Sequence, residues 1–344
     1  MELAGAHLDR HRRHEALSAR LAELSDDGLG ALLAESGAWR TNIHGNQSGA
    51  IEIDGAKVFV KKLALTELEA ANPSSTANMF DLPLFYHYGV GSSGFGVWRE
   101  LDACLRASAW ALSGEGPHFP LVHHWRVLRR PAPAPPTPGY LARLERGMTF
   151  WEQAQAIRAR LEAIRAATSS IVLFMEHAPD TLQAWLEART ADQPLDTEAE
   201  AAILRIYNQW RAAAAFMNDR GMLHFDLHRE NLLTDGERVY VADFGLAICE
   251  DFDLAPAERA FFETHRRYDR CYVDRAFTEW LAPEADPRAV LAPALLAQLE
   301  QCAPVATLFG AFLDALINGS KSTPYPASEL EAALAAQSAD SAPG

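Results

Sequence analysis

Short apolar runs separated by turn residues predict β-strands in the first half of the chain. One run, Ala50–Ile53, is followed by the turn pair Asp54-Gly55 and by a second run at Val58–Lys61. An Asp-Gly pair between two such runs favours an antiparallel hairpin. A third run, Ile171–Ala178, is almost continuously apolar and ends in a polar turn, as expected of a buried strand.

Longer segments carry apolar residues every three or four positions, which predicts helices. They are residues 1 to about 38, Val97–Leu112, Trp151–Ala167, Ala201–Arg220 and Pro256–Tyr272. Within Val97–Leu112, the expected buried face includes Leu101, Cys104, Leu105, Ser108 and Leu112. Together with the strands, these helices predict an α+β fold.

A second hairpin is predicted from Leu232–Thr234 and Val239–Val241, with an Asp-Gly turn between them. Asp226 and Asn231 precede this hairpin and Asp243 follows it, so the three side chains are expected to converge at its open end. Carboxylate and amide oxygens suit Mg²⁺, and a carboxylate can take the proton of an acceptor hydroxyl. The spacing therefore predicts a site for phosphoryl transfer.

The segments His224-Phe-Asp-Leu-His-Arg-Glu-Asn231 and Asp243-Phe-Gly245 resemble the catalytic loop and metal-binding triplet of the protein-kinase superfamily. The resemblance implies a bilobal fold, with a small antiparallel-sheet lobe that carries a helix and a larger, mainly helical lobe. It implies ATP and Mg²⁺, with Asp226 as catalytic base and with Asn231 and Asp243 as metal ligands. His224 would brace the loop from behind.

The superfamily also uses a lysine at the α- and β-phosphates, and this chain has only Lys57, Lys61, Lys62 and Lys321. The segment Val58-Phe-Val-Lys61 is similar to the lysine-bearing strand, so Lys61 is the expected phosphate contact. Lys62 would face the opposite side of the strand, as a solvated surface charge. The resemblance pairs Lys61 with a glutamate on the next helix, for which Glu100 is the first candidate and Asp102 the fallback.

Two glycine-rich stretches compete for the loop that covers the phosphates. Gly89-Val-Gly91-Ser-Ser-Gly94 matches GxGxxG in full, but it follows the lysine strand and opens a helix. Because helix N-termini bind anions, this stretch stays a candidate for contact with phosphate or substrate. Gly45-Asn-Gln-Ser-Gly49 matches less well but precedes the lysine strand, and its amides could cradle phosphates. We therefore assign Gly45 and Gly49 to nucleotide binding.

The resemblance also assigns the end of the strand Ile171–Ala178 to adenine binding. Met175 would line the adenine pocket, and the backbone of Glu176 and Ala178 would pair with the adenine edge. Asp180 would reach the ribose. An ordinary core strand has the same apolar residues, so these roles depend on the resemblance.

Two positions depart from the pattern of regulated protein kinases. Phe225 stands where many of them carry an arginine that binds a phosphate on the activation loop. Regulation by phosphorylation of that loop would therefore lack the cation it needs. His228 replaces a lysine, which looks like the small-molecule kinases that act on aminoglycosides or choline. An imidazole can still donate a hydrogen bond to the transferring phosphoryl group.

Three classes of function remain open for the acceptor. The segments Glu230-Asn-Leu-Leu233 and Asp243-Phe-Gly-Leu-Ala247 look more like protein kinases, which places a protein serine/threonine kinase first. A small-molecule kinase comes second, supported by His228 and by the rigid segment expected after Gly245. A nucleotide-binding pseudokinase scaffold comes third, because every catalytic position is filled.

The segment after Gly245 offers two further candidates. Within the helix predicted over Pro256–Tyr272, His265, Arg266, Arg267 and Arg270 could form a face that binds the acceptor, or only a solvated face. The triplet Ala282-Pro-Glu284 matches the Ala-Pro-Glu motif of the superfamily in its residue types only.

The predicted domains are an N-terminal helical extension (1–40), a small lobe (41–178) and a large lobe (179–344). The small lobe would contain a proline-rich and helical insertion at about 129–170. The tail after about Pro324 is rich in alanine and serine and is expected to fray. From Trp39 to Trp280 the chain is also similar to kinase-like proteins of high-GC bacteria, which supports the roles of Lys61 and Glu100.

The charge and the cysteine content limit the possible partners and the cellular compartment. A formal net charge of −15 argues against nucleic acid or an anionic membrane as partner. The four cysteines form no Cys-x-x-Cys pair, which fits a reducing compartment without structural zinc. With no recognisable signal peptide and no evident apolar run of transmembrane length, the cytoplasm is the expected location.

Overall fold

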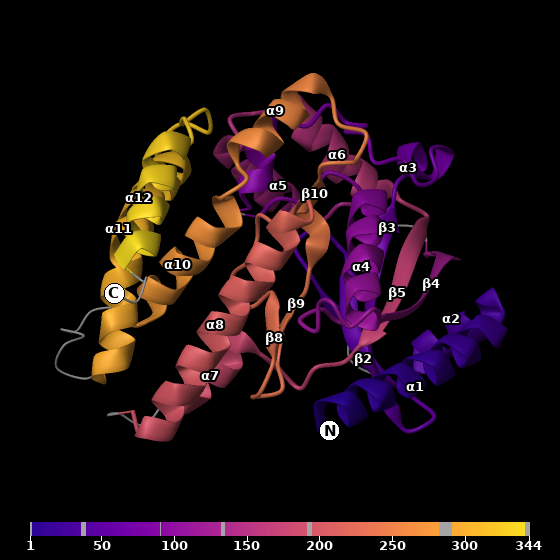
Figure 1. Ribbon diagram of the computed structural model, residues 1–344. Coiled ribbons are helices and arrows are strands. Elements are labelled where there is room, and N and C mark those ends of the chain that lie inside the picture. The colour runs from indigo at the N-terminus through magenta and orange to yellow at the C-terminus, as the bar shows by residue number, and fades with distance from the viewer. Residues whose placement is uncertain are drawn as a thin grey trace. The chain divides into compact units, whose positions relative to one another are not determined.

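A computed structural model describes residues 2–35, 39–89, 91–131, 135–190, 195–281 and 291–340 of the protein. The chain combines short antiparallel strands with a larger share of helix (Figure 1), so the predicted α+β class is confirmed. Its internal contacts define two compact units. The first unit comprises Met1–Tyr86 and Ser93–His177, and the second comprises His87–Ser92 and Ala178–Gly344.

The first unit is built on an antiparallel sheet with the strand order β1-β2-β3-β5-β4. Its strands are β1 (Arg40–Thr41), β2 (Gln47–Ile53), β3 (Ala56–Leu65), β4 (Val122–Arg129) and β5 (Ser169–Glu176). The hairpin predicted from the sequence is present, because β2 pairs with β3 across the turn Asp54-Gly55. Both turn residues have positive φ angles, which suits an Asp-Gly pair.

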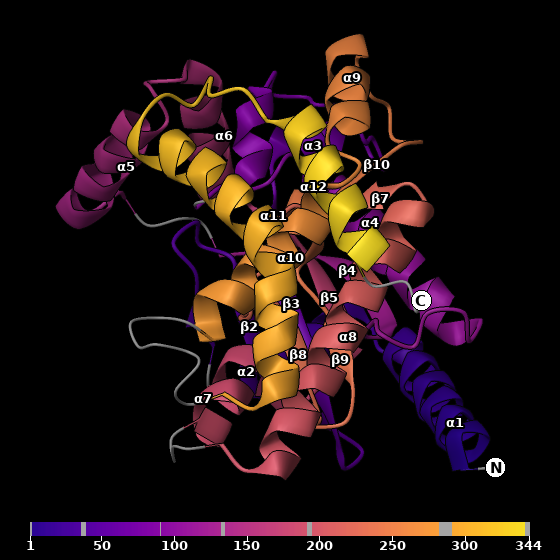
Figure 2. The same cartoon turned by 60° about the vertical axis from the view of Figure 1, so that its left-hand side comes forward.

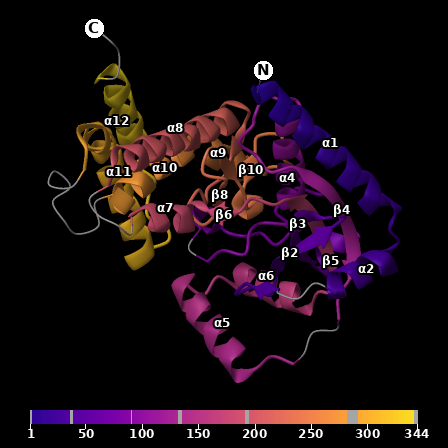
Figure 3. The same cartoon turned by 90° about the horizontal axis from the view of Figure 1, so that it is seen from below.

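The helices of this unit are α1 (Glu2–Glu23), α2 (Asp26–Glu35), α3 (Glu67–Ala71), α4 (Val97–Leu112), α5 (Pro138–Phe150) and α6 (Gln155–Ala166). Of these, α1, α2, α4 and α6 pack against the sheet. Leu21 of α1 and Leu29 of α2 pack in one buried cluster with Val58 and Val60 of β3. Figure 3 shows α1 and α2, in indigo, beside β4 and β5. The expected helical start of the chain is thus part of the core of the first unit.

The segment between β4 and β5 forms α5 and α6, where an insertion was expected. Thr137 caps α5 by accepting a hydrogen bond from the Tyr140 amide, and Pro138 occupies the first turn, where a missing amide costs nothing. Met148 and Trp151 pack with Tyr86. Tyr86 belongs to the 3₁₀ helix η1 (Leu84–Tyr88) and is the last residue of the first unit before the segment His87–Ser92.

The second unit is mainly helical. Its helices are α7 (Leu182–Thr190), α8 (Thr197–Asp219), the 3₁₀ turn η2 (Phe244–Leu246), α9 (Pro256–Thr264), α10 (Tyr268–Leu281), α11 (Pro293–Asn318) and α12 (Ala327–Asp340). Its strands are β6 (Asp180–Thr181), β7 (Met222–Leu223), β8 (Leu232–Thr234), β9 (Val239–Val241) and β10 (Ile248–Cys249). β8 pairs with β9 in antiparallel fashion, with Leu232 opposite Val241, so the second predicted hairpin is present.

Two expectations for this unit were wrong. The helix predicted over Pro256–Tyr272 is interrupted, because α9 ends at Thr264 with His265 as its C-cap and α10 begins only at Tyr268. The tail after Pro324 does not fray throughout, since it forms α12. Ala282-Pro-Glu284 lies outside the described residues.

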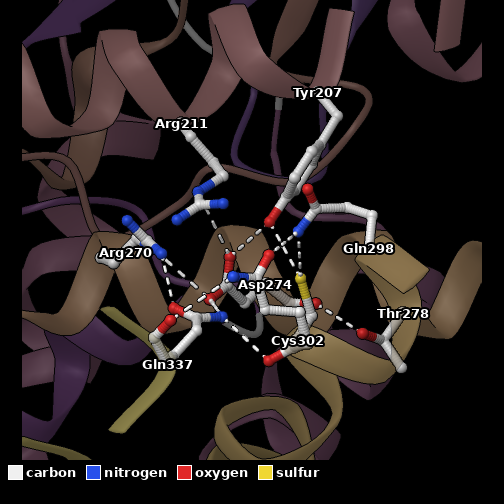
Figure 4. A network of polar contacts seen from close by, with 9 residues as sticks. Tyr207, Arg211, Arg270, Asp274, Thr278, Gln298, Cys302 and Gln337 are labelled. Atoms are coloured by element: carbon white, nitrogen blue, oxygen red, sulfur yellow. Dashed lines mark hydrogen bonds and ion pairs between the residues drawn. The ribbon is translucent and has the colours of Figure 1, made fainter. Parts of the chain in front are cut away.

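A buried polar network explains why α12 is ordered (Figure 4). The carboxylate of Asp274 on α10 accepts hydrogen bonds from Tyr207 on α8, at 2.7 Å, and from the side-chain amide of Gln337 on α12, at 2.9 Å. Gln337 also accepts a bond from Arg270 at 2.6 Å. Figure 2 shows α11 and α12 next to α10.

One helix of the described chain, α11, is long and apolar enough to cross a membrane by length and composition alone. The sequence analysis did not identify this run. Its apolar residues Leu295, Leu299, Val305, Phe309 and Leu316 are buried within the second unit, which is compatible with a soluble protein.

Candidate functional site

A buried carboxylate holds the backbone of the loop that carries Asp226. Asp269 on α10 accepts hydrogen bonds from the backbone amides of His224, at 2.8 Å, and Phe225, at 2.9 Å. It also accepts a bond from the side chain of Asn218 at 2.8 Å. Burial raises the pKa of Asp269, while these donors act in the opposite direction. The sequence analysis missed Asp269, because nothing in its local sequence marks it as different from a surface aspartate.

Phe225 adopts a positive φ of 65°, which is strained for a bulky side chain. Its fully buried ring lies 4.5 Å from that of Tyr268 and 5.5 Å from that of Phe261, measured between centroids. The bonds from Asp269 and this packing together hold the strained conformation. Phe225, which stands where many protein kinases carry an arginine, therefore anchors the loop through apolar contacts.

His224 braces the loop, as expected. The amide of Asp226 donates to Nδ1 of His224 at 3.3 Å. Nε2 must therefore carry the proton, and it donates to the carbonyl of Ala242 at 3.1 Å. The buried imidazole of His224 thus links the backbone of Ala242, the residue before Asp243, to the backbone of Asp226.

Asp226 is partly exposed and oriented by two neighbours. The side-chain amide of Asn231 donates to Oδ2 of Asp226 at 2.9 Å and to its backbone carbonyl at 3.0 Å. Nε2 of His228 lies 3.7 Å from the same Oδ2. Asn231 therefore fixes one carboxylate oxygen of Asp226, and His228 stands close enough to contact a group bound there.

Asp243 lies two residues after the end of β9 and is exposed. The amide of Ala242 donates to the carbonyl of Asn231 at 2.9 Å, so the hairpin brings Asn231 and Asp243 to the same end, as expected. The backbone of Asp243 has a φ of 62°, a conformation that aspartate tolerates better than most residues. Its side chain accepts a bond from the Gly245 amide at 3.4 Å.

The donor set at this end suits a hard cation. Because the side-chain nitrogen of Asn231 points at Asp226, its Oδ1 faces away and can act with the Asp243 carboxylate as an oxygen ligand. No cluster of three or more His, Cys, Asp or Glu side chains arranged for a metal occurs among the described residues. An Mg²⁺ ion held here would therefore need further oxygens from phosphate and water, as Mg²⁺ usually does.

In the first unit, Lys61 and Glu100 form the expected ion pair. Nζ of Lys61 lies 2.6 Å from Oε1 of Glu100, and both side chains are largely buried. Lys61 is opposite Leu173 in the sheet, and Glu100 lies in the first turn of α4. Asp102, the fallback partner, pairs instead with Arg106 on the same helix. On α4, Leu105 is exposed rather than buried as expected.

Lys62 is not the solvated surface charge that strand alternation suggested. Its Nζ lies 3.4 Å from the centroid of the Trp39 ring, and burial lowers the pKa of Lys62. Lys62 still faces away from Lys61, because Lys62 lies on the same side of the sheet as Val60 and as Val172, which is opposite Lys62 on β5.

If Lys61 binds the phosphates of ATP, as expected from the sequence, replacing it by alanine should lower phosphoryl transfer by about 10²–10³-fold, because that electrostatic contact is lost. Replacing Lys62 by alanine is the matched control and should change transfer by less than about threefold. Steady-state rates with saturating ATP measure both. A larger loss at Lys62 than at Lys61 would contradict the assignment.

The two glycine-rich stretches have different settings. Gly45 has a φ of 88° and lies in the turn between β1 and β2, and Gly49 lies within β2 opposite Val60. The other stretch lies between η1 and α4, and Gly89, Gly91 and Gly94 all have positive φ angles. Val90, which separates the first two of them, is outside the described residues.

The strand end assigned to adenine is partly occupied by other contacts. Met175 is buried and pairs with Phe59 and Val122. The amide of Glu176 donates to the carbonyl of Leu121 at 2.8 Å, so this N–H cannot also pair with an adenine edge. Its carboxylate accepts a bond from the Arg10 side chain at 2.9 Å.

Ala178 and Asp180 belong to the second unit. Ala178 lies in the loop after β5, while Asp180 begins β6 opposite Thr234 and is exposed. The exposed carboxylate of Asp180 could accept hydrogen bonds from a ribose, and this role stays a prediction.

The four basic residues proposed as an acceptor-binding face do not share one. His265 is buried, Arg266 pairs with Glu263 at 2.6 Å, and Arg270 bonds to Gln337. Arg267 is exposed in the break between α9 and α10.

His265 has a structural role. A carbonyl can only accept, so Nδ1 of His265 donates to the carbonyl of Phe261 at 2.7 Å. Nε2 then accepts from the hydroxyl of Tyr88, also at 2.7 Å. Burial lowers the pKa of His265 to about 4, so the ring is neutral at physiological pH.

This burial predicts a pH-dependent stability. Between pH 6.5 and 4, the unfolded chain binds a proton at His265 that the folded protein does not, so the unfolding free energy falls as the pH falls. The loss should be roughly 3 kcal/mol for this group. His265→Gln, which keeps an acceptor for Tyr88, should flatten part of this slope in denaturant melts. His123 has a similarly lowered pKa, so the difference between wild type and variant isolates His265. Equal slopes would contradict the prediction.

Compared with known proteins, the chain matches no protein-family model and no curated protein. The case for a function therefore depends on the geometry of these residues.

Proposed function

We propose that this protein is an ATP- and Mg²⁺-dependent phosphotransferase with a bilobal, protein-kinase-like arrangement. The observation that carries the proposal is the end of the β8–β9 hairpin. There Asn231 donates a hydrogen bond to the carboxylate of Asp226, and Asp243 lies two residues after β9. This arrangement would supply a base (Asp226) and two oxygen ligands (Asn231 and Asp243) on a loop whose backbone Asp269 and His224 hold in place.

The proposed reaction follows from these positions. Asp226 takes the proton of an acceptor hydroxyl as its oxygen forms a bond to the γ-phosphorus of ATP. The bond from that phosphorus to the bridging oxygen breaks, and ADP leaves with the electron pair. Mg²⁺ bound by Asn231 and Asp243 would neutralise phosphate charge, and His228 would donate a hydrogen bond to the transferring group.

The first unit would supply nucleotide contacts. Lys61, oriented by Glu100, would bind the α- and β-phosphates, and the amides near Gly45 and Gly49 would cover them. Met175 would contact adenine, while the backbone of Ala178 and the carbonyl of Glu176 would bind its polar edge. Asp180 would contact the ribose.

For the acceptor, we place serine or threonine of a protein first and a small-molecule alcohol second. A pseudokinase scaffold, which would bind ATP without transfer, is the non-enzymatic alternative. The cytoplasm, where ATP is abundant, is the proposed location.

The test is transfer of label from γ-³²P-ATP in a cell extract separated by size, with and without Mg²⁺. Label on macromolecules that requires both Mg²⁺ and Asp226 would support a protein kinase. Label found only on small molecules would support the second class. Mg²⁺-dependent ATP binding without any Asp226-dependent transfer would overturn the proposal of an enzyme.

A further inference from the structure

A large hollow lies within the first unit. Its volume is about 1340 Å³, and residues of α2, of the turn between β1 and β2, of the strands β3, β4 and β5, and of the helices α5 and α6 line it. Ligand pockets in proteins usually measure about 300–1,000 Å³, so this hollow has room for a whole small molecule. Of the residues proposed to bind the nucleotide, Gly45 alone also lines the hollow.

The register of the sheet places two cations and an apolar floor on the same side of it. Lys62 lies opposite Val172, which packs with Leu128 in one buried cluster. Alternate residues of a strand share a side of the sheet. Arg130 therefore lies on the side of Leu128, because its backbone amide continues the bonding of β4 to the chain next to β5. Leu128 and Val172 form the floor of the hollow, and Lys61 faces the opposite side of the sheet.

The charge of the lining is opposite in sign to that of the whole chain. Five of the lining residues are basic and two are acidic, whereas the chain has 31 lysines and arginines against 46 aspartates and glutamates. The acidic residues are Asp26 and Asp27, of which Asp26 is paired with Arg126 at 2.8 Å. A concave surface lined by charges of one sign attracts ligands of the other. The hollow therefore favours an anion. Its basic residues are Lys62, Arg129, Arg130, Arg143 and Arg165.

Two of these cations are half-buried. Burial lowers the pKa of both Lys62 and Arg130, and no neighbouring charge in the described part of the chain offsets it. The ammonium group of Lys62 lies over the Trp39 ring. Arg130 donates from Nη2 to the carbonyl of Gly45 at 3.5 Å, while its Nη1 is buried without a hydrogen-bond partner among the described residues. Because a desolvated charge is costly until an opposite charge compensates it, a bound anion would stabilise both cations.

The helices α5 and α6 add an aromatic ring and two arginines. Tyr140 is partly buried in the lining, and the guanidinium carbons of Arg143 and Arg165 lie 5.7 and 5.9 Å from the centroid of its ring. Cation–π attraction holds both arginines beside the ring. Guanidinium groups donate pairs of N–H bonds that match the oxygens of a phosphate. The lining thus combines donors for an anion with an aromatic surface for a carbon skeleton.

We propose that this hollow is a binding site for an organic phosphate. Arg130 and Arg143 would bind the phosphate group, and Tyr140 with the floor of the hollow would contact the carbon skeleton. A phosphate monoester carries about −1.5 to −2 charges at neutral pH, which suits an excess of cations better than the single charge of a carboxylate does. The site goes beyond the proposed phosphotransferase function and does not depend on it, because Lys61 faces the other side of the sheet.

The experiment is calorimetric titration of the full chain with phenyl phosphate, with inorganic phosphate and with phenol, at physiological ionic strength and without magnesium. Phenyl phosphate should bind about tenfold more tightly than inorganic phosphate, because its ring is also removed from water, and phenol should not bind measurably. Arg130→Gln keeps a donor for the carbonyl of Gly45 but removes the charge. It should weaken the binding of phenyl phosphate by about 10–100-fold, the usual contribution of one charged hydrogen bond.

Arg143 and Arg146 provide a matched pair on α5. Both are exposed, but of the two only Arg143 lines the hollow. Arg143→Gln should weaken the binding of phenyl phosphate by about tenfold, whereas Arg146→Gln, which removes the same charge from the same helix, should keep wild-type affinity. Because both side chains are at the surface, this pair keeps the test valid if Arg130→Gln does not fold.

Lys61→Ala distinguishes the hollow from the proposed nucleotide site, and it should bind phenyl phosphate as wild type does. A loss of binding in Lys61→Ala, with unchanged binding in Arg130→Gln and Arg143→Gln, would place the anion at the nucleotide site and overturn the inference. Equal affinities for phenyl phosphate and inorganic phosphate would indicate an adventitious ion only and overturn it too, as would the absence of binding. Each result is read without phosphoryl transfer, so the proposed function stands or falls separately.

Discussion

Replacing Asp226 by alanine is expected to lower phosphoryl transfer by about 10²–10⁴-fold, the usual contribution of a general base. The variant loses the carboxylate that accepts the proton of the acceptor. Mg-ATP affinity should stay close to that of wild type, because the assigned metal ligands Asn231 and Asp243 remain. Single-turnover label transfer and calorimetric titration with Mg-ATP measure the two quantities.

Asn231 makes this prediction more specific. Its amide donates to Asp226 at two places, of which only the backbone carbonyl survives in Asp226→Ala. Asp226→Asn, which keeps the size of the side chain, is therefore the better control for loop structure and should be equally inactive. Retained turnover in either variant would remove Asp226 from the mechanism.

Replacing Asp269 by alanine is expected to destabilise the protein by roughly 3–5 kcal/mol, because it leaves three donors without the carboxylate that accepts from them in a buried place. Transfer should fall with stability, since the strained backbone of Phe225 depends on the same bonds. Denaturant melts and transfer rates, corrected for the folded fraction, report both effects.

Asp274 is the matched control, since it is also buried on α10. It bonds to Tyr207 and Gln337 (Figure 4), not to the loop of Asp226. Asp274→Ala should therefore lower stability by a similar amount while the folded fraction keeps its transfer rate. If Asp269→Ala kept that rate as well, Asp269 would have no role in positioning the loop.

Much of the fold was predictable where the signal is local. The Asp-Gly turns identified both hairpins, and periodicity placed α4 and α8 close to their observed bounds. Strand alternation put Lys61 on the side of β3 opposite Lys62. In each case, residues close together in sequence determine the conformation or the side that a residue faces.

Other features were not predictable because they depend on residues far apart in sequence. Lys62 was expected to be solvated, but its ammonium group lies over the ring of Trp39, which is far from it in the sequence. The tail after Pro324 was expected to fray because it is rich in alanine and serine, but Gln337 bonds to Asp274, which lies 63 residues away in the sequence. The helix predicted through His265 breaks where the ring of that residue bonds to Tyr88.

The sequence by itself determined which chemical groups the β8–β9 hairpin carries, since a short hairpin can bring its two ends together in only one way. The tertiary structure alone decided what holds and surrounds them. Asp269 reaches the loop from 45 residues away in the sequence, and the backbone of Gly89 lies against Asp226. Such contacts arise from packing between distant segments, and the burial that gives them their strength leaves no local pattern in the sequence.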